Sequence, residues 1–220
     1  MLFLLNFWYI YKIYKLFLKF KNFTGKNKLL FFFYFGIHFL SLGQAKTSQQ
    51  ILSQISTEGE ILGFVEHCQD RAILTQIPII PHLLGDNKLK TSSKYGYRIH
   101  PIYHTLKFHA GIDMATTTTD TIVVSAEGVV EQMGYQSGLG NYIVVRHKFG
   151  FMTLYGHLKM VFVKPNQIIG VAQTIGLVGN TGIVTGKHLH YTIIKNGYYL
   201  NPYLMMYLFL KVPIGNINPP

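Results

Sequence analysis

The feature that most constrains the fold is a series of short strand-like runs that begins near residue 91. Val, Ile, Tyr and Thr dominate runs such as "TIVVSA", "NYIVVRH" and "FMTLYGHL", and Gly or Asn separates them. β-Branched and aromatic residues favour strands, and turn signals at regular intervals between short strands are typical of sandwiches and barrels. Asn196-Gly197 suits a two-residue type I′ hairpin turn. The sequence therefore predicts a mostly β fold, an all-β sandwich or barrel-like sheet.

The segments on either side of these runs have a different texture. "SQQILSQI" has apolar residues at helical spacing and "IPIIPHLLGD" supplies helix breakers, so residues 46–87 are predicted to form a short helix and a connector. The main domain is predicted to span residues 88–203, followed by a C-terminal tail over 204–220. The apolar "PYLMMYLFLKVP", residues 202–213, fits a terminal strand or helix packed on the sheet better than a contact with a membrane or partner.

Residues 1–45 are predicted to be a hydrophobic signal or anchor region with a helical segment. Lysines precede the apolar run "LLFFFYFGIHFLSL", residues 29–42, and the small residues of "GQA" follow it, which is the pattern of a secretory signal cleaved after Ala45. The run is short for a membrane span but long enough for an anchor if it is not cleaved. The sequence therefore predicts export to the cell envelope, either the periplasm or the cell surface, with membrane contact through the N-terminus.

The charge pattern argues against a nucleic-acid partner. The formal net charge is +11, but residues 1–45 hold six lysines and no acidic residue, and the remaining 14 basic and 9 acidic residues leave a surplus of only +5. No recognition-helix, zinc-finger or aromatic-sheet signature accompanies the positive charge. A mildly basic surface suits an anionic polymer, and no nucleic acid is expected as a partner.

Residues that favour metal binding stand in "FHAGIDMA". Cys68 is the only cysteine, so neither an intrachain disulfide nor a cysteine zinc site can form, and any metal must be held by imidazole and carboxylate groups. His109 and Asp113 would lie about 13 Å apart on a fully extended strand, too far apart to share an ion. Gly111 permits a bend that would bring the two side chains together.

The second candidate stretch is "GKHLHYTII". His188 and His190 are two residues apart, so on a strand they share a face, and the simplest interpretation is a half-buried strand with two hydrogen-bonded histidines. If His190 joins His109 and Asp113, three N and O ligands leave a fourth position open, as in catalytic zinc sites. His188 would lie about 6–7 Å along the strand and would flank the ion, and His157 in "LYGHL" is a second candidate for proton transfer.

The order of these motifs resembles the lysostaphin/LytM-type zinc metallopeptidases, which are mostly peptidoglycan endopeptidases. "YGYRIHPI", "HAGID", "YGHL" and "IGLVGNTGIVTGKHLHY" followed by "NP" cover about residues 88–202 in the family's order. The resemblance implies a mostly antiparallel β structure with one zinc ion at the floor of a groove. It implies three zinc ligands, His109, Asp113 and His190, and two catalytic histidines that do not bind zinc, His157 and His188.

The resemblance also implies a function. We expect a zinc-dependent endopeptidase that cleaves peptide bonds in peptidoglycan stems or cross-bridges, with a peptidoglycan peptide as its partner. A first alternative is a non-catalytic scaffold of the same fold that regulates another cell-wall hydrolase. A second is a structural or membrane-interaction protein dominated by the apolar N-terminus.

Some positions depart from the family pattern or sit beside its motifs. "TDTIV" and the residues Asn166 and Ala172 stand where the family usually has glycine-containing turns, which affects loop geometry and not the metal chemistry. Tyr103, Asn141 and Tyr155 are plausible substrate contacts. The remaining histidines near the motifs are expected in a groove wall or at the surface: His100, His104 and His147.

Overall fold

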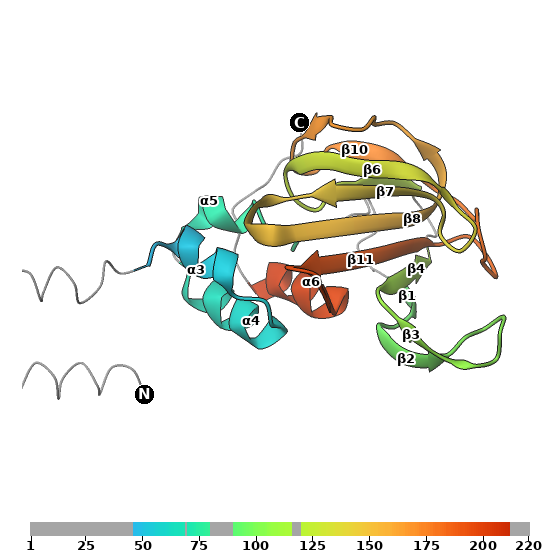
Figure 1. Cartoon of the computed structure of the whole chain (residues 1–220), viewed down its shortest axis with the longest axis horizontal. Helices are drawn as coiled ribbons and strands as arrows, with labels where there is room; N and C mark the ends of the chain where they lie inside the picture. The colour runs from blue at the N-terminus through green and yellow to red at the C-terminus, as the bar shows by residue number, and fades with distance from the viewer. Residues whose placement is uncertain (1–45, 69, 80–89, 116–119, 212–220) are drawn as a thin grey trace, which may run out of the picture. The chain divides into compact units, whose positions relative to one another are not determined.

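The computed structural model describes residues 46–68, 70–79, 90–115 and 120–211 (Figure 1). The predicted signal or anchor region, residues 1–45, lies outside the described residues, and the described residues from Thr47 onward form one compact unit. The α-helices of the described part are α3 (Ser48–Gln54), α4 (Glu58–His67), α5 (Arg71–Leu74) and α6 (Pro202–Lys211), and a 3₁₀ helix, η1, spans Lys148–Gly150. In this part of the chain no helix is long and apolar enough to span a membrane.

Strands make up most of the rest of the described chain. Their bounds are β1 (Lys90–Ser93), β2 (Gly96–Ile99), β3 (Leu106–His109), β4 (Ile112–Ala115), β5 (Thr121–Val123), β6 (Gly128–Gln136), β7 (Gly140–Arg146), β8 (Phe151–Val161), β9 (Ile168–Ile169), β10 (Thr174–Val178), β11 (Leu189–Lys195) and β12 (Tyr198–Leu200). This confirms the prediction of a mostly β fold.

Ten of these strands form one antiparallel sheet and two form a separate hairpin. The main path runs β1-β4-β11-β8-β7-β6-β9, while β12 pairs with β11 and β5 joins through β10. The hairpin consists of β2 and β3, and Figure 1 shows it at the opposite end of the sheet from helices α3, α4 and α5. The antiparallel architecture agrees with the one that the motif resemblance implies.

Strand β8 changes its neighbour along one edge. Its residues up to Gly156 pair with β11, and its residues from Leu158 onward pair with β10. His157 lies between the two pairings and has a positive φ of 63°, which an L-residue seldom adopts within a strand. The pairing with β7 also shifts register in this region, between Asn141 and Ile143. Bulges of this kind bend a strand and turn a side chain out of the regular alternation.

The hydrophobic core joins the sheet and the helices. Tyr155 and Tyr191 are fully buried in the sheet, and Ile61 of α4 and Met205 of α6 belong to the same cluster. Burial of each large apolar side chain contributes roughly 1.5–3 kcal/mol. The described part of the segment predicted as one helix and a connector contains three helices, and α6 runs across the predicted boundary at residue 203.

A polar clamp, formed by Lys195 and Asn196, attaches the end of α3 to the hairpin between β11 and β12. The Lys195 ammonium donates to the carbonyls of Phe149 and Ser53, the latter at 3.5 Å. The Asn196 amide donates to Ser53 O at 3.2 Å and to Ser56 Oγ at 2.9 Å. Burial lowers the pKa of Lys195 to about 8. The clamp satisfies backbone acceptors that a helix end leaves open.

Two of the family departures adopt the backbone conformation that glycine favours. Asn166 has a φ of 62° and Ala172 a φ of 59°. Asparagine tolerates the left-handed region, but for alanine the Cβ crowds the following carbonyl oxygen. The turns therefore form without glycine, and the position of Ala172 carries backbone strain.

Candidate active site

Three side chains from different strands converge on one point. His109 ends β3, Asp113 lies in β4, and His190 lies in β11, where it pairs directly with Asp113. His109 Nε2 lies 3.1 Å from Asp113 Oδ1 and 3.0 Å from His190 Nδ1. Asp113 Oδ1 and His190 Nδ1 lie 2.9 Å apart. These residues form a group that could hold a metal ion. The structure thus brings together the two stretches that are 81 positions apart in the sequence.

Gly111 allows β4 to approach β11 closely enough for this convergence. A Cβ at this position would lie 2.3 Å from the Tyr191 carbonyl oxygen and 2.6 Å from Thr192 Oγ1. Gly111 is not among the residues with a positive φ. The glycine is therefore required by the close contact of two backbones, whereas the sequence suggested a bend.

Hydrogen bonds on the outer side of each imidazole leave the inner nitrogen unprotonated. His109 Nδ1 donates to the Lys94 carbonyl at 2.8 Å, so its Nε2 carries the lone pair. His190 Nε2 lies 3.1 Å from Thr192 Oγ1, which can accept its proton and leave Nδ1 free. Metal-binding histidines commonly have such outer partners, which fix the tautomer and the ring orientation.

The donor set fits a zinc ion. Tetrahedral zinc with bonds of about 2.0–2.1 Å to nitrogen and oxygen places its ligand atoms roughly 3.3 Å apart, close to the three separations found here. The side chains of His109, Asp113 and His190 are exposed by only 8, 10 and 12%. Although burial opposes ionisation, the interactions with the His109 and His190 rings hold the pKa of Asp113 well below its ordinary value. A charged carboxylate and two neutral imidazoles suit zinc better than magnesium or calcium.

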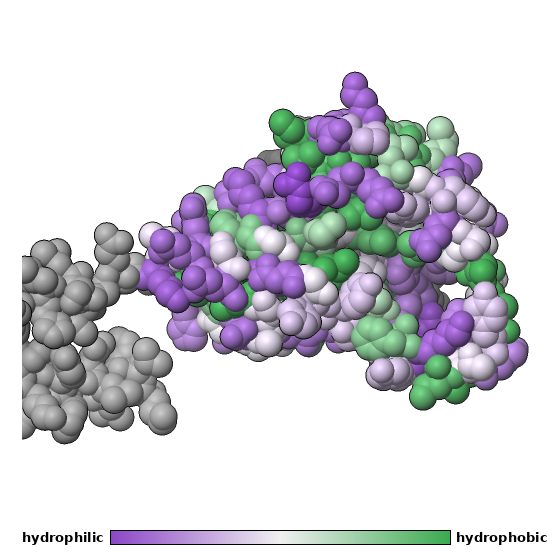
Figure 2. Space-filling view, viewed as in Figure 1, coloured by the Kyte–Doolittle hydropathy of each residue, from purple (hydrophilic) through white to green (hydrophobic). Residues whose placement is uncertain are grey.

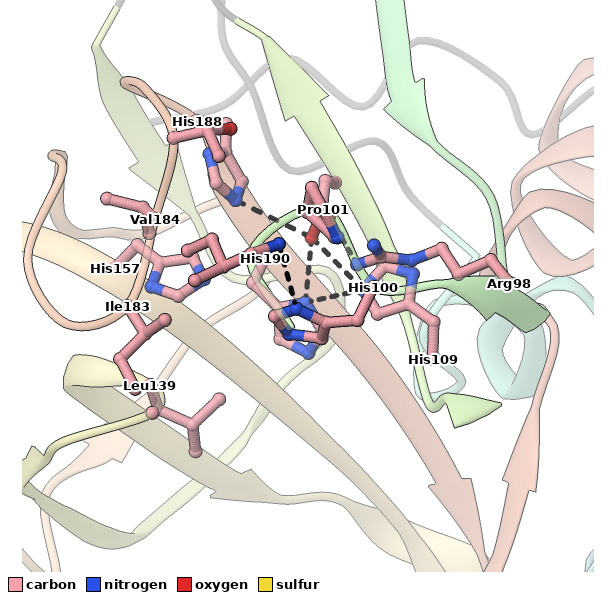
Figure 3. Close-up of a pocket in the computed structure, with 14 residues that line it drawn as sticks. Arg98, His100, Pro101, His109, Leu139, His157, Ile183, Val184, His188 and His190 are labelled. Carbon is pink, nitrogen blue, oxygen red and sulfur yellow. Dashed lines mark hydrogen bonds and ion pairs between the residues drawn. The ribbon is translucent and has the colours of Figure 1, made fainter. Parts of the chain in front are cut away.

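Two further imidazoles lie beside this group. His157 and His188 have ring centroids 4.7 Å apart, and His188 Nε2 is 3.7 Å from Asp113 Oδ1 (Figure 3). Each donates its Nδ1 proton to a backbone carbonyl, His157 to Thr181 and His188 to Gly186. Their Nε2 atoms are therefore free to accept a proton. Burial, then the neighbouring imidazoles, lower the pKa of His157 to about 4.

A groove opens over these five residues. A hollow of about 170 Å³ is lined on one side by Pro101 and Ile102 and on the other by Leu139, Ile183 and Val184. Figure 3 shows Ile183, Val184 and Leu139 on the His157 side and Pro101 on the Arg98 side. The space-filling view shows an opening between hairpin β2–β3 and the body of the molecule (Figure 2). The walls are partly apolar, so the groove suits an extended peptide with apolar and polar parts.

Arg98 is a site residue that the sequence reasoning missed. Its Nη2 lies 3.4 Å from Asp113 Oδ2, and its side chain lines the groove. The signal was present in "YGYRIHPI", because Tyr97 and Ile99 alternate with Arg98 along a short strand. Among the other expected wall residues, His100 does line the groove.

Two expectations for other residues were wrong. His147 is 5% exposed, and it contacts the Glu127 carbonyl at 2.8 Å and Thr153 Oγ1 at 2.8 Å inside the core, not in a groove wall. Tyr155 is fully buried and its hydroxyl lies 3.1 Å from Ser125 Oγ, so it cannot contact substrate. The sequence motifs did not indicate whether His147 and Tyr155 face the groove or the core of the sheet.

The antiparallel β fold brings two histidines and one aspartate to one point, with two more histidines beside them, which are side chains that a metallopeptidase site could use. Residues 107–202 match the family model described as "Peptidase family M23". Residues 107–202 therefore match a peptidase M23 domain, which confirms the resemblance seen in the motifs.

Known proteins resemble part of this chain. It is 42% identical over 113 residues to the DD-carboxypeptidase/endopeptidase Mpg of Neisseria meningitidis serogroup B, covering 51% of this chain and 26% of that protein. It is 40% identical over 105 residues to the peptidoglycan DD-endopeptidase ShyC of Vibrio cholerae, covering 48% and 24%. The crystal structure of a zinc-containing peptidase from Vibrio cholerae matches with a TM-score of 0.53 and 26% identity over 58% of this chain and 40% of that one. The chain thus spans about a quarter of the length of these two curated relatives.

Proposed function

We propose that this chain is a zinc-dependent endopeptidase that hydrolyses peptide bonds in peptidoglycan stems or cross-bridges. One observation carries the proposal: His109 Nε2, Asp113 Oδ1 and His190 Nδ1 face one another at 2.9 to 3.1 Å from three different strands. In the proposal these three residues hold the zinc ion. The open side of the group faces the groove, where His157 and His188 stand.

The catalytic roles follow from the donors and acceptors that each side chain has left. When bound, zinc would act as a Lewis acid that acidifies water and polarises the scissile carbonyl. His157 and His188 each present an unprotonated Nε2, so either imidazole can take a proton from the attacking water and return it to the leaving amine. The protonated imidazole can also stabilise the negative charge that develops on the carbonyl oxygen. No nucleophilic side chain is needed.

The substrate assignment is supported by the relatives. Mpg is named a DD-carboxypeptidase/endopeptidase and ShyC a peptidoglycan DD-endopeptidase, and each matches about half of this chain. Digestion of purified cell-wall material by the full chain, followed by mass spectrometry of the released ends, tests the proposal. New amino termini should appear with zinc and disappear when a chelator removes it. Intact wall peptides in the presence of a zinc-loaded chain would contradict the function.

A wall substrate places the site of action in the cell envelope, and we propose that residues 1–45 direct export. The observation behind this is the basic, apolar and small-residue order of that segment. Amino-terminal sequencing of the mature protein should give a start at or near Lys46 if the segment is cleaved, or Met1 in the membrane fraction if it remains as an anchor. An intact Met1 on a cytosolic protein would exclude both.

A further inference from the structure

Arg98 and Lys107 make one side of the groove positively charged. The two residues are direct neighbours across hairpin β2–β3, where Arg98 pairs with Lys107. Tyr97 and Ile99, on the opposite face, are 76% and 62% exposed, whereas the Arg98 side chain is only 26% exposed. Both basic residues line a hollow of about 300 Å³ that also contacts His109 and His190. The hairpin therefore turns its charged side toward the candidate zinc site.

The guanidinium of Arg98 has few partners. Its contact with Asp113 Oδ2 is 3.4 Å long, whereas charge-assisted hydrogen bonds of this type are usually about 2.7–2.9 Å. Its Nε is buried and has no hydrogen-bond partner in the described part of the chain. Figure 3 shows the guanidinium extending toward the imidazole group from the side opposite His157. Since Asp113 Oδ1 already contacts both His109 and His190, this carboxylate is shared among several cationic or polar groups.

The charges around Arg98 are not balanced. Among the described residues that line the two hollows, Asp113 is the only acidic one. Partial desolvation, followed by the positive charges of Lys107 and Arg98, lowers the pKa of His100 below its ordinary value. Lys107 itself lies over the Tyr103 ring at 3.9 Å. A negatively charged group entering this side of the groove would meet two basic side chains and one carboxylate.

We infer that Arg98 binds a carboxylate of the peptide substrate, on the side of the scissile bond away from His157 and His188. The inference rests on the proposed function and names the class of substrate: a peptide with a free carboxylate close to the bond that is cut. A guanidinium is suited to this task because its planar N–H groups match the two oxygens of a carboxylate. The carboxylate is either the terminal α-carboxylate of the peptide or that of an acidic side chain.

The test uses the zinc-loaded full chain with His188→Ala, so that peptides bind without being consumed. The probes are a synthetic glutamate-containing pentapeptide ending in D-alanyl-D-alanine, its C-terminal amide, and the form in which the glutamate is replaced by glutamine. Calorimetry gives the dissociation constant of each. Each of the two amide forms lacks one carboxylate. We expect one of them to bind roughly 10- to 100-fold more weakly than the parent peptide, and the form that does so identifies the carboxylate that Arg98 binds.

Adding Arg98→Gln should remove that difference, while Lys107→Gln, the matched control on the neighbouring strand, should keep most of it. Zinc content is measured for every variant. If Arg98→Gln loses zinc, Arg98→Lys is used in its place. Arg98→Lys should reduce the difference in affinity between the peptides, because an ammonium lacks the planar fork of a guanidinium. Equal binding of all three peptides, binding of none, or a difference that persists without Arg98 would overturn the inference. Hydrolysis of wall material by the unmodified chain is measured separately. Hydrolysis without a preference for the carboxylate-bearing peptide contradicts this inference alone. A preference for that peptide without hydrolysis contradicts the proposed function alone.

Discussion

The imidazoles of His157 and His188 lie edge to face, with ring centroids 4.7 Å apart and planes at 63°. This pair stands beside the group of His109, Asp113 and His190 and comes from two separate parts of the chain. Two imidazoles at this distance can divide the tasks of accepting and donating one proton. Their contribution should therefore be separable from metal binding.

We expect His190→Ala to lose zinc and activity together, since one of three protein ligands is removed. His157→Ala and His188→Ala should keep zinc near one equivalent and lose activity by roughly 10²–10⁴-fold, the usual contribution of a positioned acid or base. Metal analysis and wall hydrolysis on the single variants, with His109→Ala and Asp113→Ala included, provide the comparison. If His188→Ala loses zinc while His190→Ala keeps it, the roles of His188 and His190 are reversed.

Gly111→Ala should destabilise the fold and weaken zinc binding. The new methyl group would lie 2.3 Å from the Tyr191 carbonyl oxygen, so β4 and β11 must move apart. Overpacking of this kind costs about 1–3 kcal/mol. Gly134→Ala is the matched strand control, because its nearest neighbour is Tyr142 Oη at 3.6 Å. Urea unfolding and zinc titration should separate the two variants; equal stabilities would show that the close strand contact is not needed.

Ala172→Gly should stabilise the protein. Relief of the left-handed strain at a φ of 59° is worth about 1–2 kcal/mol, and the greater freedom of glycine in the unfolded chain offsets about 0.5–1 kcal/mol of it. Asn166→Gly should give a smaller gain, since asparagine tolerates this region. Chemical denaturation of both variants measures the difference. A loss of stability in Ala172→Gly would contradict the strain.

Stability should fall between pH 6.5 and pH 4 because of His147. Burial lowers the pKa of His147 to about 4, only partly opposed by its hydrogen bond to Glu127 O. In this interval the unfolded chain binds a proton that the folded chain does not, so acidification favours unfolding by up to about 3 kcal/mol. His147→Gln should be less stable at neutral pH but lose this part of the pH dependence.

The control for that experiment is His104→Gln, which alters an exposed loop residue. Acid also weakens zinc binding, so the comparison is the difference in unfolding free energy between each variant and the unmodified chain at each pH. An unchanged pH dependence in His147→Gln would show that the buried imidazole is not its source.

Alternation and spacing were enough to predict much of this fold. The Val- and Ile-rich runs became strands, and the two motifs with His109 and His190 meet across β3, β4 and β11 as their order implied. Such patterns determine which face of a strand is apolar, and they depend only on neighbouring residues. The convergence of distant motifs, by contrast, was inferred from the family resemblance and not from local patterns.

What the sequence did not reveal depends on breaks in alternation and on long-range packing. His157 points into the groove because β8 changes partners and bends there, and no residue type near it requires this. His147 looked like a surface histidine because its core partners, Glu127 and Thr153, are not adjacent in sequence. Arg98 occupied a short, mostly exposed strand, where a basic residue is ordinary.

The polar clamp gives the protein an internal chemical reporter. The Lys195 amine is fully buried against backbone carbonyls, and this burial lowers its pKa to about 8. Amine-directed acylating reagents should therefore spare Lys195 while α3 is attached and modify it when the helix detaches. The rate of its labelling would thus report how often the helical segment opens away from the β domain, without an introduced probe.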